Sequence, residues 1–123
     1  MEVSAVYTES AAAPAGPYSQ AVLANGFVFV SGQRPVQPES GQIPNGITAQ
    51  CHQALDNLSD VLLAAGTDMQ KVVRVNIFLA DIEAFADVND VYKRYFKAPF
   101  PARTTVACSL RGILIEIDAI AVI

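Results

Sequence analysis

At 123 residues the chain has the size of one domain, and we expect a single domain over residues 1–123. The net charge is −4, and the eight lysines and arginines form no basic stripe, which disfavours binding to nucleic acid. No stretch approaches the roughly 18 apolar residues of a membrane span, and the apolar residues 21–30 lack a basic flank. We therefore expect a cytoplasmic protein with neither a membrane span nor a signal peptide.

The composition is apolar for a small soluble protein. Hydrophobic residues make up 52% of the chain and charged residues 16%, with a mean hydropathy of +0.32. A chain of this length has too little interior to hide so much apolar surface, so we expect other copies of the chain to cover part of it. The alternative is a monomer with a well-filled core.

The N-terminal third contains a predicted β-hairpin. Residues 3–7 are a candidate first strand, followed by a turn-rich stretch. Residues 19–24 and 27–32 then flank Asn25 and Gly26, a pair that tolerates the positive φ angles of a type I′ turn. This pattern predicts two antiparallel strands joined by a tight turn.

A loop, a helix and a strand are predicted next. Residues 34–46 hold three prolines and two glycines, which indicates a surface loop. From about 47 to 65 apolar residues recur every three or four positions, as on one face of a helix, and Gly66 supplies a left-handed stop. Residues 71–79 follow as a strand with one apolar face, formed by Val73, Val75, Ile77 and Leu79.

A second helix is predicted over residues 82–96, ended by Pro99 and Pro101. Lys93, Arg94 and Lys97 are expected to form its solvated face. Its buried side is expected to comprise Phe85, Val88, Val91, Tyr92, Tyr95 and Phe96.

Two strands end the chain. The first carries Arg103 and Thr105 on one face, and a short connection over residues 109–112 leads to the last strand, residues 113–122. That last strand is apolar on one face and carries Glu116 and Asp118 on the other. These elements predict an α+β fold, a mixed sheet with two helices on one face and subunit contacts on the opposite face.

The cysteines and the histidine give no sign of a metal site. Cys51 and Cys108 lie far apart in the sequence, and we expect both to be reduced and buried. His52 has no partner at ligand spacing, so we expect no metal. The sequon at Asn57 lies inside the predicted helix and is interpreted as chance.

Arg103 is the most informative single residue. A guanidinium stays protonated and is costly to desolvate, so in an apolar strand it needs an anionic partner or full hydrogen bonding. Its planar fork suits a carboxylate. The residues leave two interpretations open, namely a site for a bound carboxylate and a structural salt bridge to Glu116 or Asp118.

Seven segments in register resemble the RidA family, also called the YjgF/YER057c/UK114 family. They are GPYSQA at 16–21, FVSGQ at 29–33, QALDNL at 53–58, LLAAG at 62–66, VNDVY at 88–92, PART at 101–104 and IEIDAIAV at 115–122. The resemblance implies a chorismate-mutase-like α+β fold and a homotrimer with three sites in the clefts between subunits. It also implies hydrolysis of the enamines and imines of 2-amino acids, such as 2-aminoacrylate, 2-iminopropanoate and 2-iminobutanoate, to 2-keto acids and ammonia, without cofactor or metal.

The resemblance assigns roles to individual residues. Arg103 matches the arginine that pairs with the substrate carboxylate, and Glu116 matches the glutamate that positions the attacking water. The other matching residues line or shape the cleft: Tyr18, Ser31, Gly32 and Asn89. The structural alternatives are that Tyr18 is a packing aromatic and that Asn89 caps or braces a helix.

The chain departs from the family pattern at two places. Residues 109–112 replace a longer connection, and Thr105 replaces a cysteine found two positions after the arginine. We expect the backbone of Thr105 to serve in place of that cysteine, so Thr105 is counted among the substrate-binding residues. The alternative functions are a non-catalytic trimer that binds small carboxylates or acts as a holdase, and a deaminase specific to one pathway. A ribonuclease or translation inhibitor is disfavoured by the acidic charge.

Overall fold

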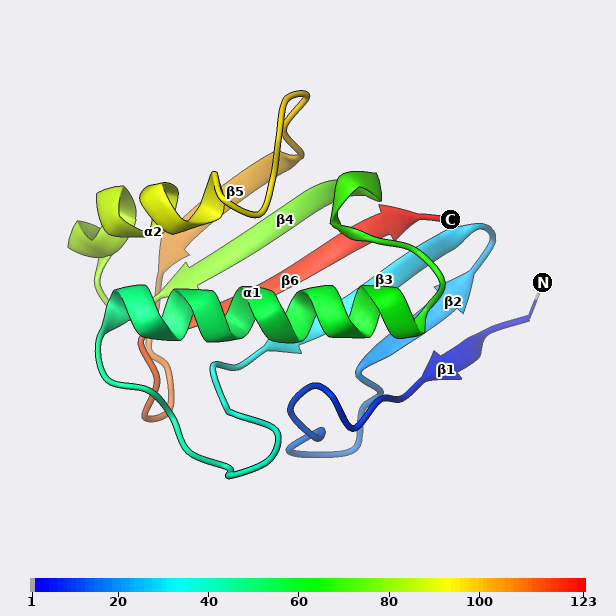
Figure 1. The fold of residues 1–123 in the computed structure, drawn as a ribbon, viewed down its shortest axis with the longest axis horizontal. Helices are drawn as coiled ribbons and strands as arrows, with labels where there is room; N and C mark the ends of the chain where they lie inside the picture. Colours follow the sequence, from blue (N-terminus) through cyan, green and yellow to red (C-terminus); the bar gives the residue numbers. More distant parts are fainter. Residues whose placement is uncertain (1) are drawn as a thin grey trace.

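A six-stranded mixed sheet forms the frame of the protein in the computed structural model, which describes residues 2–123 (Figure 1). The strand order is β1-β2-β3-β6-β4-β5, and all neighbours are antiparallel except β4 and β5. The strands are β1 Ser4–Val6, β2 Ala21–Ala24, β3 Phe27–Gln33, β4 Val72–Leu79, β5 Ala102–Ala107 and β6 Ile115–Val122. Figure 1 shows the helices on one side of this sheet, as the sequence predicts.

The hairpin of β2 and β3 has the predicted tight turn. Asn25 and Gly26 have φ angles of 53° and 80°, and Ala24 pairs with Phe27 on either side of them. Such angles match the right-handed twist of the flanking strands. Along β3, buried Val28 and Val30 alternate with exposed Phe27 and Phe29.

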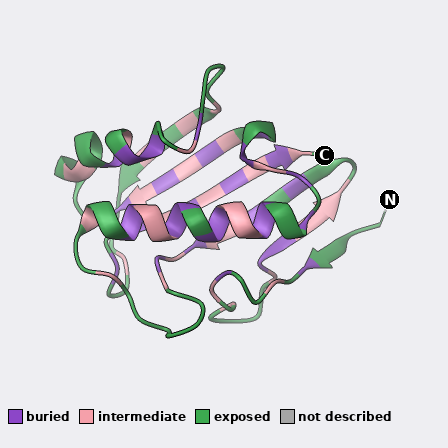
Figure 2. Cartoon of the chain, in the orientation of Figure 1, coloured by how far each residue is buried: buried purple, intermediate pink, exposed green. Residues whose placement is uncertain are grey.

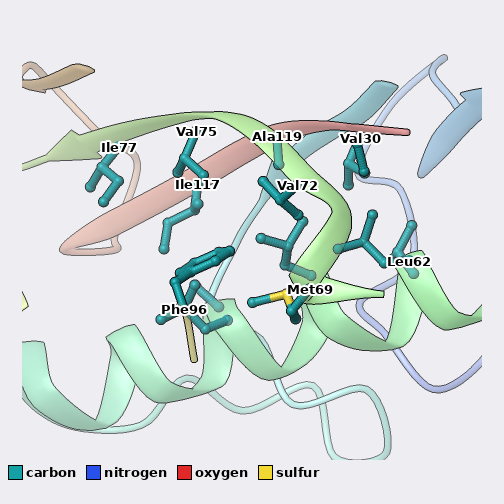
Figure 3. Close-up of a cluster of buried hydrophobic side chains, with 14 of the residues drawn as sticks. Val30, Leu62, Met69, Val72, Val75, Ile77, Phe96, Ile117 and Ala119 are labelled. Atoms are coloured by element: carbon teal, nitrogen blue, oxygen red, sulfur yellow. The ribbon is translucent and has the colours of Figure 1, made fainter. Parts of the chain in front are cut away.

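The long helix α1, Ile47–Ala64, covers the middle of the sheet and confirms the predicted helix. Its inward face includes Leu55, Leu58 and Leu62, all fully buried, and each such leucine contributes about 1.5–3 kcal/mol relative to an exposed one. Gly66, with φ 89°, turns the chain out of the helix. In Figure 3, the side chains of Leu62 and of Met69, the first residue of the short helix η1 (Met69–Lys71), lie in the same buried cluster as the strand side chains. Within residues 2–123, no helix has the length and apolar character to cross a membrane.

The second helical segment is shorter than predicted. It consists of η2, Ile82–Ala84, and α2, Phe85–Tyr92, so the expected extension to residue 96 is wrong. Beyond α2 the chain tightens into turns and inserts Phe96 between helix and sheet (Figure 3). Phe85 was expected to be buried but is 43% exposed. Lys93, Arg94 and Lys97 are exposed as predicted, although they follow the helix rather than lie on it.

Two further predictions fail at the sheet. In β4 the pairing with β6 shifts between Val72 and Arg74, so Val73 is an extra residue that points outward and is 44% exposed. Val72 replaces it on the buried face. Cys108 is exposed, because it follows the edge strand β5, whereas Cys51 is buried in α1 as expected.

The side of the sheet opposite the helices is only partly covered. In Figure 2, buried and half-buried residues alternate along most of β4 and along β6. Because successive side chains of a strand point to opposite faces, and the buried ones pack against the helices, the half-buried ones lie on the other face. This open face carries Phe29, Phe78, Glu116, Asp118 and Ile120. A single chain thus leaves a mixed apolar and acidic sheet surface without a second layer.

Candidate functional site

A cavity of about 610 Å³ opens where Glu116, near the start of β6, meets loops from three parts of the chain. Tyr18 comes from the segment before β2, Arg34 from the residue after β3, and Arg111 from the connection between β5 and β6. The remaining lining residues are Ala15, Ser109, Leu110 and Ile113. Two arginines and one carboxylate therefore share this cavity.

Buried glutamines hold two of these loops in place. The side-chain oxygen of Gln20 accepts a hydrogen bond from the Thr8 N–H at 2.7 Å, and its amide nitrogen donates to the carbonyls of Thr8 and Ala12, both at 3.0 Å. Gln50 of α1 accepts from the Leu114 N–H at 2.8 Å and donates to the Pro44 carbonyl. A buried amide without hydrogen bonds is costly, so these contacts fix the positions of the two loops.

Asn57 holds the third loop. It is fully buried on α1, and its Nδ2 donates to the carbonyls of Arg34 at 3.0 Å and Val36 at 2.9 Å. From the sequence, no structural role was predicted for Asn57, and its sequon was interpreted as chance. The available signal was an amide at an inward position of an otherwise apolar helix face, which indicates a buried polar group with a specific partner.

Glu116 lies directly against Gly32. The pairing of β3 with β6 is irregular between Val30 and Gln33, which lets the backbone at Gly32 approach the carboxylate. A Cβ atom at Gly32 would stand 2.9 Å from Glu116 Cδ and nearer still to Oε2. Only glycine leaves the carboxylate in its present position.

Two more of the predicted residues lie beside Gly32 and Glu116. The Ser31 hydroxyl donates to the Ser19 carbonyl at 2.6 Å and so ties β3 to the segment that carries Tyr18. The Tyr18 oxygen accepts from the Ala15 N–H at 3.0 Å, which orients the ring at the cavity while its own O–H can still donate. Tyr18, Ser31, Gly32 and Glu116 therefore form one group.

Arg103 belongs to a second group, beside α2. Its Nη2 donates to Asn89 Oδ1 at 2.7 Å, and its guanidinium carbon lies 4.7 Å from the centre of the Tyr92 ring and 5.3 Å from that of Phe85. Two aromatic faces and one amide hold the cation. This contact explains why Phe85 turns away from the core. A cavity of about 330 Å³ adjoins the group and is also lined by Phe100.

The guanidinium has hydrogen-bonding capacity to spare. Within residues 2–123 the only ion pair joins Lys93 Nζ to Asp90 Oδ1 at 3.3 Å, so the salt-bridge interpretation of Arg103 is wrong for the single chain. The nearby Thr105 hydroxyl is buried and has no hydrogen-bond partner among the described residues.

Burial raises the pKa of the Cys51 thiol to about 12 despite the opposing charge of Arg103, so that thiol stays protonated.

Arg103 and Glu116 project from opposite faces of the sheet. Phe78 pairs with Glu116 on one side and with Val106 on the other, and directly paired residues share a face. Arg103 and Thr105 alternate with Val106 and therefore point to the helix side. One chain does not bring its own arginine and glutamate into the same cavity.

Asp118 also lies on the open face, in a polar network across three strands. Asn76 Nδ2 donates to Asp118 Oδ1 at 2.9 Å, and Arg74 donates to Asn76 Oδ1 at 3.3 Å and to the Thr104 hydroxyl. Burial raises the pKa of Asp118 above its ordinary value of 3.8, and the Asn76 hydrogen bond and the charge of Arg74 oppose that rise. The folded protein thus holds this proton to higher pH than the unfolded chain does.

Replacing Asp118 by Asn should therefore flatten part of the pH dependence of stability. In the native protein the contribution of Asp118 to the unfolding free energy falls as pH rises above about 3.8, because the unfolded chain releases the proton first. Urea midpoints at several pH values should show Asp118→Asn gaining on wild type between pH 3 and pH 7. The exposed Glu39→Gln serves as the control, and a gap between Asp118→Asn and wild type that does not change with pH would contradict this role.

No metal centre is formed by the described residues. Across residues 2–123, no three His, Cys, Asp or Glu side chains gather closely enough to bind an ion. His52 Nδ1 instead lies 2.9 Å from the Tyr95 hydroxyl. The cavity that contains Glu116 offers one carboxylate, the Tyr18 hydroxyl and the two guanidinium groups of Arg34 and Arg111.

Known proteins are similar to this chain over nearly its whole length. A family model described as Endoribonuclease L-PSP matches residues 8–123. The chain is 48% identical to a Bos taurus protein named 2-iminobutanoate/2-iminopropanoate deaminase, covering 95% of this chain and 88% of the relative. The crystal structure of YyfA from Yersinia pestis, of the conserved Rid protein family, superposes with a TM-score of 0.95 at 42% identity, covering 99% of this chain and all of the other. The crystal structure of E. coli TdcF with bound serine has a TM-score of 0.92 at 34% identity and covers 98% of both chains.

Proposed function

This chain belongs to the Endoribonuclease L-PSP family, which includes the RidA proteins, and we propose that it hydrolyses 2-imino acids and their enamine tautomers to 2-keto acids and ammonia. The substrates proposed first are 2-aminoacrylate, 2-iminopropanoate and 2-iminobutanoate. The observation that carries the proposal is the Glu116 carboxylate, held over Gly32 at the wall of an open cavity. The Bos taurus relative is named for two of these imines.

The reaction needs little from the protein. A protonated imine is already electrophilic at C2, so Glu116 need only orient a water molecule and accept its proton as the oxygen attacks. The carbon–oxygen bond forms while the carbon–nitrogen bond loses its double-bond character. Glu116 then returns this proton to the nitrogen and accepts the proton of the new hydroxyl, so the carbon–nitrogen bond breaks, ammonia leaves and the hydroxyl becomes the carbonyl of the 2-keto acid. Arg103, which is held by Asn89 and the ring of Tyr92, binds the carboxylate that every 2-imino acid carries.

We further propose that two copies of the chain complete each site. Arg103 and Glu116 lie on opposite faces of one sheet, so a single cleft can contain both only if they come from different chains. The open face offers the required contact surface, with Phe27 and Phe29 both exposed on it. A homotrimer with three clefts, as the family resemblance implies, satisfies this geometry, and Asp118 would then lie at the subunit boundary.

The assay follows the imine directly. An amino-acid oxidase generates 2-iminopropanoate or 2-iminobutanoate in situ, and semicarbazide traps whatever imine survives. We expect wild-type protein to suppress the trapped product in proportion to its concentration, with heat-denatured protein as the control. A protein that binds serine or a keto acid but leaves the imine untouched would instead be the non-catalytic carboxylate-binding trimer.

The family description also names an endoribonuclease, and the charge argues against that activity here. The net charge is −4 and the chain has no basic stripe to follow a phosphate backbone. Any RNA cleavage by a preparation should therefore persist unchanged in Arg103→Ala, as expected of a contaminant. Cleavage lost with Arg103 would favour the ribonuclease instead.

A further inference from the structure

Two arginines without an assigned role line the cavity that contains Glu116. The chain has eight lysines and arginines in all, and Arg34 and Arg111 meet at this one cavity. Neither takes part in the ion pair that residues 2–123 contain, which joins Lys93 to Asp90. Set against the single carboxylate of Glu116, they make the cavity wall cationic in a protein whose net charge is −4.

Arg34 is the better placed of the two. It is half-buried, and its carbonyl accepts from the Val36 N–H at 2.8 Å and from Asn57 Nδ2 at 3.0 Å, while Pro35 beside it is buried. A guanidinium that starts from a fixed backbone loses less conformational entropy on binding a ligand. Arg111 is exposed, on a connection pinned at Leu114 by Gln50, so its contribution should be smaller.

We propose that Arg34, assisted by Arg111, binds a second carboxylate on the substrate side chain, so that the protein favours dicarboxylic 2-imino acids. This inference rests on the proposed function, because it concerns the cleft that contains Glu116. Arg103 already accounts for the carboxylate next to the imine, which leaves the forks of Arg34 and Arg111 for another planar anion. A cavity of about 610 Å³ has room for a side chain of two or three carbons that ends in a carboxylate.

The same charges should act against other substrates. A cationic side chain would meet two guanidinium groups of like charge, and a short apolar side chain would leave both without a partner. The preference should therefore appear chiefly as a lower KM for the dicarboxylate. The water held by Glu116 is the same for every substrate, so kcat should change little.

The test compares two imines that share a five-carbon chain. Amino-acid oxidases generate 2-iminoglutarate from glutamate and 2-iminopentanoate from norvaline, and semicarbazide trapping gives kcat and KM for each. In Arg34→Gln we expect KM for 2-iminoglutarate to rise about tenfold, the loss of one charged hydrogen-bonded contact, with 2-iminopentanoate unaffected. Arg34→Lys should recover part of the loss, and Arg111→Gln should show a smaller one. Arg94→Gln, the same change at an exposed residue outside the cavity, should match wild type.

The remaining outcomes of this comparison also test the second carboxylate site. Equal kcat/KM values for the two imines, unchanged by Arg34→Gln, would overturn the proposal while leaving the deaminase intact. Loss of activity toward both imines would also overturn it, since Arg34 would then bind the carboxylate that all 2-imino acids share. If wild type hydrolyses 2-iminobutanoate but neither five-carbon imine, the preference for dicarboxylic imines is overturned while the proposed function stands. If it hydrolyses none of the three, the proposed function fails, and calorimetry with the keto acids tests the second carboxylate site. Tighter binding of 2-oxoglutarate than of 2-oxopentanoate, lost in Arg34→Gln, supports the second carboxylate site, and equal binding refutes it.

Discussion

Arg103→Ala and Glu116→Gln should each lower kcat/KM for 2-iminobutanoate by at least about 100-fold, and a mixture of the two variants should recover activity. Glutamine cannot accept the proton of the attacking water, so Glu116→Gln should act mainly on kcat. Alanine removes the fork that holds the substrate carboxylate beside Asn89, so Arg103→Ala should raise KM as well. Both variants should fold, because neither side chain belongs to the buried core.

The mixture should recover activity because Arg103 and Glu116 lie on opposite faces of the sheet and so enter one cleft from different chains. We assume that each cleft takes Arg103 from one chain and Glu116 from another. When equal amounts of the two variant chains assemble at random, about one cleft in four then contains both intact residues. Subunits must be exchanged first, by co-expression or by refolding the variants together. We expect about a quarter of wild-type activity from the mixture, far above the residual activity of either separate variant. Mixed protein with no more activity than its parts would place both residues in a single chain's site and contradict the shared cleft.

Gly32→Ala should abolish most of the activity while leaving the protein stable. The new Cβ would stand 2.9 Å from Glu116 Cδ and closer to Oε2, so the carboxylate has to swing away. Its displacement costs little in folding because the end of a glutamate side chain is flexible. A shift of about 1 Å in a catalytic group can cost about 100-fold in rate, which sets the expected loss of kcat.

A matched glycine substitution separates this effect from a general one. At Gly16 an added Cβ would meet only the Tyr18 ring at 3.6 Å, an ordinary contact, so Gly16→Ala should keep near-normal kcat. Urea midpoints should be no lower for Gly32→Ala than for wild type. An active Gly32→Ala would mean that the position of Glu116 in this cavity is not the catalytic one, and an unfolded variant would mean that the close approach serves the fold.

Local patterns predicted those elements whose signals are local. The Asn25-Gly26 turn and helix α1 lie where the sequence placed them, because turn angles and a repeat of three to four residues are properties of neighbouring residues. The second helix was predicted too long, since its end depends on where Phe96 reaches the core. Val73 was placed on the wrong face because a bulge depends on the partner strand, whose sequence lies some 45 residues away.

The candidate site was predicted in part. Residue type and family resemblance singled out Arg103, Glu116, Tyr18 and Gly32. The structure places Glu116 and Tyr18 at one cavity, with Gly32 directly against the Glu116 carboxylate. The roles of Asn57, Gln20 and Gln50 were missed, because an amide reveals its purpose only through the carbonyl it reaches. Arg34 was missed for a related reason, since a charged residue in a proline-rich loop normally indicates solvent exposure.

By itself, then, the sequence determined the chemistry available and the local elements that carry it. It supplied a guanidinium in an apolar strand, a carboxylate in another, and the alternation that assigns each strand two faces. Only the tertiary structure decided that Arg103 faces the helices and Glu116 the open side, because strand register joins residues far apart in the chain. The same long-range packing set the Glu116 carboxylate on Gly32 and brought Arg34 and Arg111 to one cavity.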